Sequence, residues 1–254
     1  MNADRIKALS HAGVAVEVVQ ETGSTNSDLL ARAETLTAPL LRVALHQTAG
    51  RGRAGRSFLT AAGGALTFSL AWQFDGPLQR LSGLPLAVGV ALADALKALD
   101  VPVQLKWPND LLKDGAKLAG MLVETRPAPH GGTLAVIGIG LNLAVPDALE
   151  QQIGRSVAAA TWLAQMDRDV LMAALLDALA ATLRDFAGAG FAPFCARWNS
   201  HHAHAGRDVT IVDNGVVLHT GVAAGVDDSG ALLLDTAAGR VVVHAGDVSL
   251  RPAT

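Results

Sequence analysis

The residues with the richest chemistry form a run of glycine and arginine at 47–56 (QTAGRGRAGR). Small residues separate Arg51, Arg53 and Arg56, so we expect a flexible loop that brings guanidinium groups to a phosphate or carboxylate. A solvated basic loop is one alternative, since charged runs are usually surface. An RNA-binding segment is another, and the acidic net charge and the lack of neighbouring aromatic residues count against it.

The three glycines of this run have a spacing that is also found in dinucleotide-binding proteins. Gly50, Gly52 and Gly55 match that fingerprint by letter, but the fingerprint opens a helix, whereas a strand pattern follows Gly63 and Gly64 here. The glycines make the loop entropically costly to order. We therefore expect it to be displaced or disordered without ligand and to close over a bound one.

A second polar group ends a predicted strand at 106–110 (KWPND). Pro108 favours an extended conformation at Trp107. Asn109 and Asp110 then follow a buried strand, where open sheets commonly place ligand-binding groups. These side chains are expected to bind substrate or to pair with the loop arginines. An ordinary turn is the alternative and, by residue type alone, the commoner one.

Two apolar strand patterns contain residues that weaken a strand. Lys117 stands at the entry of one of them and either extends to water or holds an anion near the core. Gly120 lies inside the same pattern, and Gly138 and Gly140 lie inside the other. Glycine within a strand indicates close approach of backbone or ligand, with a bulge as the alternative.

The other reactive side chains show no catalytic pattern. His201, His202 and His204 have no carboxylate or thiolate near them in sequence, so we predict a solvated loop between domains and no metal site. Cys195 lies in an apolar helix pattern and is expected in the core. The sequence contains no Ser-His-Asp order, no HExxH and no Walker-type loop.

Composition excludes several classes of protein. Lys and Arg number 20 against 23 Asp and Glu in 254 residues, a balance that does not fit a dedicated nucleic-acid or membrane-surface protein. With 50% hydrophobic and 17% charged residues the chain can bury a core and is not disordered. One cysteine fits a reducing compartment. No run of about 18 apolar residues is present, so we expect a cytoplasmic protein that does not span a membrane.

The element order predicts an α+β fold with a mixed sheet over residues 1–204. Predicted strands are 14–19, 41–46, 65–72, 101–107, 118–125 and 134–142, and predicted helices are 27–36, 84–99, 170–186 and 191–198. A polar loop at 199–206 follows, and closely spaced strands come next, at 209–212, 216–226, 231–234 and 240–244. They predict a small SH3-like β-barrel domain over residues 205–254.

Taken in order, these motifs resemble those of the biotin–protein ligase family over nearly the whole chain. Gly50–Arg56 is similar to the family's biotin/adenylate loop, and Lys106–Asp110 and Lys117–Gly120 are similar to its next two signatures. Ser24–Asn26 resembles its first biotin-contacting turn. Each motif is modest alone, and the ordered set is specific. The resemblance implies a class II synthetase-like catalytic domain followed by the SH3-like barrel.

The resemblance also implies a reaction in two steps. The biotin carboxylate attacks the α-phosphate of ATP, with Mg²⁺ bridging phosphates, and gives biotinyl-5′-AMP and pyrophosphate. A lysine of a biotin carboxyl carrier domain of a biotin-dependent carboxylase then displaces AMP. Two anions must meet, so Arg51, Arg53 and Lys117 would offset their repulsion. The resemblance implies two catalytic residues. Lys117 would contact the biotin carboxylate and the α-phosphate, and Arg53 would protect the mixed anhydride from hydrolysis.

Further binding residues follow from the same resemblance. Biotin would contact Ser24, Thr25, Asn26, Gln47, Gly50, Arg51, Gly52, Arg53, Ser69, Lys117, Gly120, Gly138 and Gly140. The nucleotide would contact Arg51, Arg53, Arg56, Phe58, Asn109, Asp110, Lys117, Asn142 and Arg251. Phe58 would stack on adenine where relatives use tryptophan, and Arg251, just after the last predicted strand, would reach the phosphates from the small domain.

Two alternatives remain at this stage. A lipoate–protein ligase shares the chemistry and fold, although the Gly/Arg loop and the KWPND motif favour biotin. A non-catalytic binding module is the other. Some family members begin with a winged helix-turn-helix domain that has no counterpart here, so no DNA binding is expected. Exposed edge strands of the mixed sheet leave a homodimer open.

Overall fold

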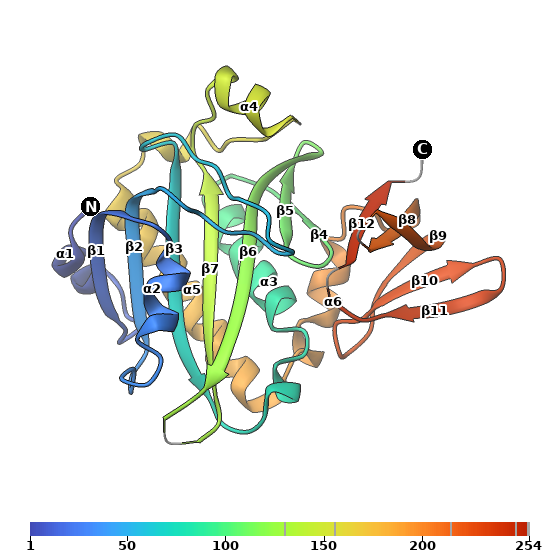
Figure 1. The fold of residues 1–254 in the computed structure, drawn as a ribbon, viewed down its shortest axis with the longest axis horizontal. Coiled ribbons are helices and arrows are strands. Elements are labelled where there is room, and N and C mark those ends of the chain that lie inside the picture. The colour runs from blue at the N-terminus through green and yellow to red at the C-terminus, as the bar shows by residue number, and fades with distance from the viewer. Residues whose placement is uncertain (130, 155, 214, 247, 253–254) are drawn as a thin grey trace.

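A computed structural model describes residues 1–129, 131–154, 156–213, 215–246 and 248–252. Its larger part is built on a seven-stranded mixed sheet, in which β1 and β2 pair in parallel and all other neighbours are antiparallel (Figure 1). In spatial order the strands are β1 (Ala15–Thr22), β2 (Leu40–Gln47), β3 (Ala65–Phe74), β7 (Thr133–Asn142), β6 (Ala116–Pro127), β5 (Asp110–Lys113) and β4 (Gln104–Lys106).

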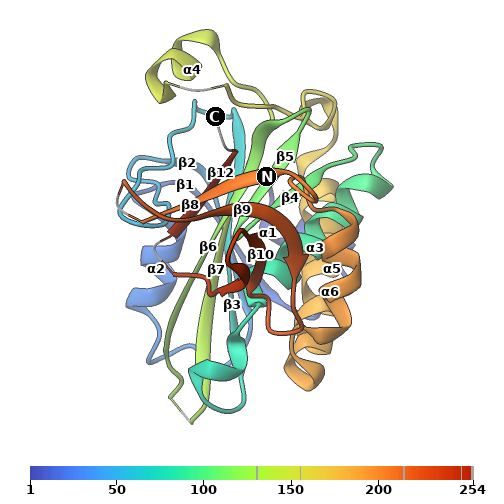
Figure 2. The same ribbon diagram turned by 90° about the vertical axis from the view of Figure 1, so that its right-hand side faces the viewer.

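Helices lie on both faces of this sheet, and the two faces differ in how completely they are covered. The core lies on the face of α3 (Leu84–Ala98) and α5 (Arg168–Ala189), which pack against each other and are joined there by α1 (Ala3–Leu9) and α6 (Ala192–Ser200). The opposite face carries α2 (Thr25–Ala31), as Figure 2 shows from the side. Because α2 is short, much of that face is left for loops and a cavity.

The core helices follow from their sequences. Helix α3 is apolar around most of its circumference and is therefore buried. The stretch Leu78–Ala98 is long and apolar enough to cross a membrane by composition, yet 61% of its most apolar 18-residue window is buried inside the protein, as expected for a core helix. Helix α5 is capped at its N-terminus by Asp167, whose carboxylate accepts hydrogen bonds from two backbone N–H groups of the first turn.

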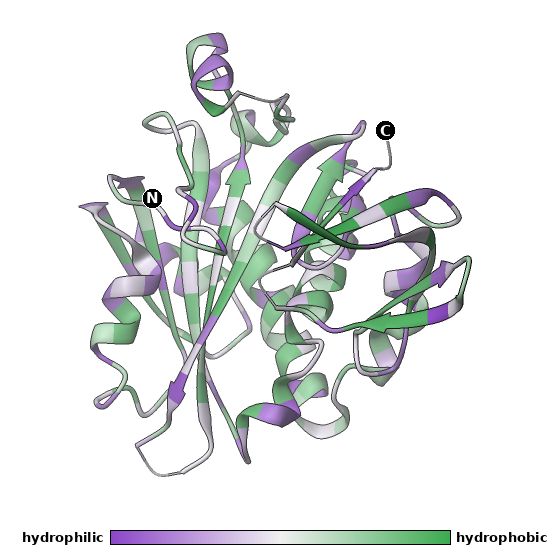
Figure 3. Ribbon diagram, turned by 45° about the vertical axis from the view of Figure 1, so that its right-hand side comes forward, coloured by the Kyte–Doolittle hydropathy of each residue, from purple (hydrophilic) through white to green (hydrophobic). Residues whose placement is uncertain are grey.

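The second part is a five-stranded antiparallel sheet in the order β11, β10, β9, β8, β12. Its strands are β8 (Asp208–Asp213), β9 (Val216–Val226), β10 (Leu232–Thr236), β11 (Gly239–Val243) and β12 (Val248–Pro252). Asn199 joins it to α6, since its amide exchanges two hydrogen bonds with the backbone of Val226 at 2.8 and 3.1 Å. Figure 3 shows apolar residues concentrated where elements pack. The predicted α+β class, with a small β domain at the end, is confirmed.

Several sequence-based boundaries were wrong. Strands β5 and β12 and helices α1 and α4 (Asp147–Ile153) were not predicted, and α2 ends at Ala31, where the chain enters hydrogen-bonded turns. Strand β4 is three residues long, because only that part pairs with β5. Arg251 therefore lies within the last strand, paired with Thr210 of β8, rather than after it.

Candidate functional site

A cavity of about 690 Å³ lies on the α2 side of the large sheet. Its wall combines the start of α2, the Gly/Arg loop between β2 and β3, the glycines of β6 and β7, helix α4 and Arg251 of β12. Six cationic side chains line it, namely Arg51, Arg53, Arg56, Lys106, Lys117 and Arg251. Among the described lining residues Asp110 carries the one acidic side chain. The cavity is thus suited to an anionic ligand.

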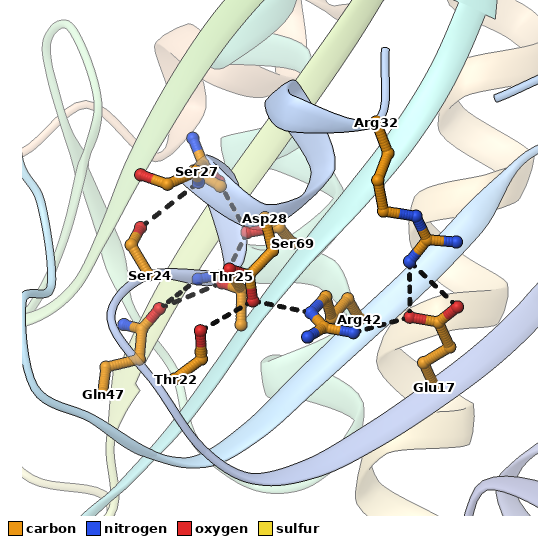
Figure 4. A network of polar contacts seen from close by, with 11 residues as sticks. Glu17, Thr22, Ser24, Thr25, Ser27, Asp28, Arg32, Arg42, Gln47 and Ser69 are labelled. Atoms are coloured by element: carbon orange, nitrogen blue, oxygen red, sulfur yellow. Dashed lines mark hydrogen bonds and ion pairs between the residues drawn. The ribbon is translucent and has the colours of Figure 1, made fainter. Parts of the chain in front are cut away.

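The start of α2 forms one polar wall (Figure 4). Ser24 is the N-cap and its hydroxyl accepts from the Ser27 backbone N–H. Thr25 and Asn26 follow, and both are buried. The Thr25 backbone N–H donates to Oε1 of Gln47 at 2.8 Å, so the end of β2 fixes the helix start. These four predicted biotin-binding residues all line the cavity.

A charged network behind this wall holds α2 against β1 and β2 (Figure 4). Asp28 accepts hydrogen bonds from Thr22 Oγ1 and from Nε of Arg42, both at 2.7 Å. Arg42 also pairs with Glu17 at 2.7 Å, and Arg32 pairs with the same carboxylate at 2.8 Å. Hydrogen bonds from Arg32 and then Arg42 hold the pKa of the Glu17 carboxyl below its ordinary value. The network supports the cavity wall without lining it.

Two predicted contact residues are not on the cavity wall. Ser69 is fully buried beneath α2, where its hydroxyl lies 2.6 Å from Thr25 Oγ1 and donates to Oδ1 of Asn26 at 2.5 Å. Gly50 is buried at the base of the loop, and its carbonyl accepts from the Phe58 N–H at 2.8 Å. Both lie behind the cavity wall, Ser69 against the side chains of Thr25 and Asn26 and Gly50 against the backbone of Phe58.

The three strand glycines lie where a side chain would collide with a cavity residue. A Cβ at Gly138 would overlap the Asn26 carboxamide, and one at Gly140 would overlap the Phe58 ring. A Cβ at Gly120 would come within 2.7 Å of the Lys117 ammonium. Close approach of neighbouring side chains therefore explains these glycines in the structure, whereas the sequence interpretation expected close approach of backbone or ligand.

Lys117 and Arg53 line the same cavity from different segments of the chain. The Lys117 ammonium on β6 pairs with Asp110 Oδ1 of β5 at 2.5 Å, and both side chains are about four-fifths buried. Arg53 donates to Oδ1 of Asn109 at 3.1 Å and to the carbonyl of Gly246 near β12. The predicted pairing of the KWPND motif with the loop arginines is thus present for Asn109, whereas Asp110 pairs with Lys117.

The Gly/Arg segment is a loop, as predicted, closed by a bridge between Arg51 and Ser57. The N–H of Gly52 donates to the Arg56 carbonyl at 2.7 Å. Arg56 is exposed, and Phe58 lies at the cavity edge against Gly140. Closure of this loop over a ligand stays a prediction.

On the far side of the cavity, Asn142 is buried and lines the wall. Its amide donates to the backbone carbonyl of Lys117 at 3.4 Å and to that of Ala158 at 3.2 Å. These bonds join β7 to β6 and to the segment beyond α4. Asn142 therefore fixes the backbone from which Lys117 projects.

The histidine loop is not solvated, contrary to the sequence interpretation. Backbone hydrogen bonds at 2.8 and 2.9 Å attach His201 and Ala203 to Leu105 of β4. His202 packs its ring on Trp198 at 4.7 Å, and burial lowers the pKa of His202 and His204 to about 4. Within the described ranges no group of three His, Cys, Asp or Glu side chains could hold a metal.

Some cavity residues escaped the sequence analysis. Lys106 lines the wall and was detectable as the first residue of the KWPND motif. Leu149 and Ile153 line it from α4, and the four-residue spacing of these two apolar side chains was the available signal.

Comparison with known proteins agrees with this geometry. A family model described as "Biotin/lipoate A/B protein ligase family" matches residues 16–143, and one described as "Biotin protein ligase C terminal domain" matches residues 204–251. "Bifunctional ligase/repressor BirA" of Escherichia coli is 33% identical over 100% of this chain and 79% of that protein. "Biotin--[acetyl-CoA-carboxylase] ligase" of Paracoccus denitrificans is 34% identical over 91% of this chain and 98% of that protein.

A solved structure, "Biotin protein ligase from Aquifex aeolicus in complex with biotin and ATP", matches with a TM-score of 0.78 and 27% identity, covering 94% of this chain and 99% of that one. A mixed-sheet α+β fold with a cationic cavity, in a chain that aligns over 91% of its length with 98% of such an enzyme, defines a protein of the ligase class. The chain belongs to the biotin protein ligase family.

Proposed function

We propose that the cavity holds biotin and ATP side by side, so that the biotin carboxylate meets the α-phosphate between Lys117 and Arg53. The chain has biotin protein ligase activity. The observation that carries the residue assignment is the convergence of these two cations from β6 and the Gly/Arg loop on one cavity that also contains the Ser24–Asn26 turn.

In the first step a carboxylate oxygen of biotin forms a bond to the α-phosphorus, and the bond to the leaving pyrophosphate breaks. The Lys117 ammonium contacts both reacting anions and offsets their repulsion most strongly where negative charge accumulates. Arg53 lies over the mixed anhydride and excludes water. Asp110 orients the Lys117 ammonium through their 2.5 Å contact.

In the second step the ε-amine of an acceptor lysine attacks the biotinyl carbonyl, AMP leaves with the bonding electrons, and the amine loses a proton. The acceptor is proposed to be a biotin carboxyl carrier domain of acetyl-CoA carboxylase. No side chain of the chain becomes covalently attached, so the protein acts by positioning and by charge.

The two ligands occupy different ends of the cavity in this proposal. Biotin contacts Ser24, Thr25, Asn26, Gln47, Arg51, Gly52, Gly120, Gly138 and Gly140, and the nucleotide contacts Arg56, Phe58, Asn109, Asn142 and Arg251. Mg²⁺ would arrive with ATP, be held chiefly by phosphate oxygens, and supply charge neutralisation. Asp110 is the carboxylate within the cavity that could reach it.

Three further assignments belong to the same proposal. The division into a catalytic domain at 1–204 and a small domain at 205–254 follows the change from the large sheet to the small one. A cytoplasmic location follows from the supply of ATP. An edge strand such as β1 would form the contact of a homodimer.

The test is a transfer reaction with the full chain. It is incubated with ATP, Mg²⁺, biotin and a carboxylase carrier domain, and intact-mass spectrometry of the carrier follows. Addition of one biotinyl group to a single lysine supports the proposal, with lipoate in place of biotin as the control. Modification by lipoate in preference to biotin, or no biotin-dependent release of pyrophosphate, contradicts it.

A further inference from the structure

Glu124 of β6 contacts both the start of α2 and the Gly/Arg loop, two parts of the proposed biotin site. Its Oε2 accepts a hydrogen bond from the Asn26 amide at 2.9 Å. Its Oε1 forms an ion pair with the Arg51 guanidinium, which also donates to Ser27 Oγ at 3.1 Å. The Glu124 side chain is 23% exposed and that of Arg51 is 43% exposed. One carboxylate therefore joins the fixed wall to the Gly/Arg loop.

The contact with Asn26 determines which way its carboxamide faces. Ser69 donates to Asn26 Oδ1 at 2.5 Å, so the amide oxygen points to β3. The amide nitrogen points to β6, where it donates to Glu124 and to the Leu122 carbonyl at 3.3 Å. A charged acceptor strengthens this bond relative to a neutral one. Glu124 thus fixes a side chain that lies against Gly138 on the biotin wall.

The contact with Arg51 acts on the loop. Arg51 lies between Gly50 and Gly52, where the backbone is free to adopt many conformations. An ion pair to a strand residue reduces that freedom and keeps the guanidinium at the mouth of the cavity. Glu124 also faces a groove beside the cavity that is lined by Arg53 and Asn109, so its charge lies next to the predicted anion site.

We propose that Glu124 is a positioning residue for biotin binding, an inference that rests on the proposed function. Its carboxylate holds the Asn26 amide and the Arg51 guanidinium in one arrangement, so that the wall and the loop are preset for biotin. Since it touches neither reacting group, Glu124 acts on the affinity for biotin and leaves the chemical step unchanged.

The test is a double-mutant cycle with Glu124→Gln and Arg51→Gln, measured as biotin-dependent pyrophosphate release. Glutamine keeps an oxygen for the Asn26 amide and removes the negative charge facing Arg51. For Glu124→Gln we expect KM for biotin to rise about three- to tenfold, the effect of losing a charge-assisted contact. Its kcat should stay within about twofold of the parent value. Glu124→Asp, which keeps the charge with a shorter reach, should give an intermediate KM. The effect of E124Q should shrink when Arg51 is already glutamine.

The matched control is Glu21→Gln, which removes a carboxylate that pairs with His46 at 2.9 Å on the edge strand β1, outside the cavity. It should leave KM for biotin unchanged. An unchanged KM in an active E124Q variant, or effects of E124Q and R51Q that simply add, would overturn the inference alone. A parent protein that releases no pyrophosphate with biotin overturns the proposed function and this inference with it.

Discussion

Replacing Lys117 by alanine should slow catalysis strongly while it destabilises the fold only slightly. At about 4 Å and an effective dielectric constant of about 20, the ammonium interacts with a unit negative charge by about 4 kcal/mol. Loss of that interaction in the transition state slows adenylate formation by roughly a hundredfold to a thousandfold. The Lys117–Asp110 pair is four-fifths buried, so its removal costs the fold about 1–2 kcal/mol, between exposed and buried pairs. In a chain of this size that lowers Tm by only a few degrees.

The assay is single-turnover formation of biotinyl-5′-AMP, with thermal unfolding of the same samples. Lys113→Ala is the matched control, because Lys113 pairs with Asp114 at 2.5 Å beside the same strands and does not line the cavity. K113A should react at the parent rate. A K117A protein that is folded and forms adenylate at the parent rate would refute the electrostatic role of Lys117.

Three further predictions test other parts of the site. Gly138→Ala places a methyl group on the Asn26 carboxamide and should raise KM for biotin roughly tenfold in steady-state assays with little change in KM for ATP. Phe58→Ala should raise KM for ATP roughly fivefold or more through lost stacking, and Phe58→Trp should restore it. The pKa of His202 is lowered to about 4, so the unfolded chain takes up a proton first as the pH falls from about 6.5 toward 4. Protonation linked to His202 alone should lower the free energy of unfolding by up to about 3 kcal/mol over that range, and His204, whose pKa is also lowered to about 4, adds a loss of its own. Urea titrations should find the total loss reduced in His202→Phe and intact in His11→Gln.

The ordered motifs predicted residues that the structure brings together around one cavity, because residue type and the strand that carries each motif can be read from the sequence. Lys117, Asn109 and the loop arginines could be assigned to one anion site from sequence, and the structure brings them to one cavity. Ser69 was predicted to contact biotin directly. Sequence could not show that α2 covers it, since coverage depends on packing between distant segments.

The wrong predictions for the histidine loop and for β5 also arise from contacts between segments that are distant in sequence. His202 and His204 are polar residues in a stretch without periodicity, which predicts solvent exposure, yet pairing with β4 carries them into the interior. Strand β5 is four residues long and exists because β4 and β6 pair with it on either side. Short elements of this kind are determined by their neighbours and leave little pattern of their own.

Lys117 and Arg53 are proposed to act on the same mixed anhydride of biotin and AMP from two segments of the chain. A crystal structure of the full chain with a non-hydrolysable analogue of biotinyl-5′-AMP measures this directly. We expect the Lys117 ammonium and the Arg53 guanidinium both to lie within hydrogen-bonding distance of the linkage between biotin and AMP. An analogue bound with either side chain turned away to solvent would contradict it.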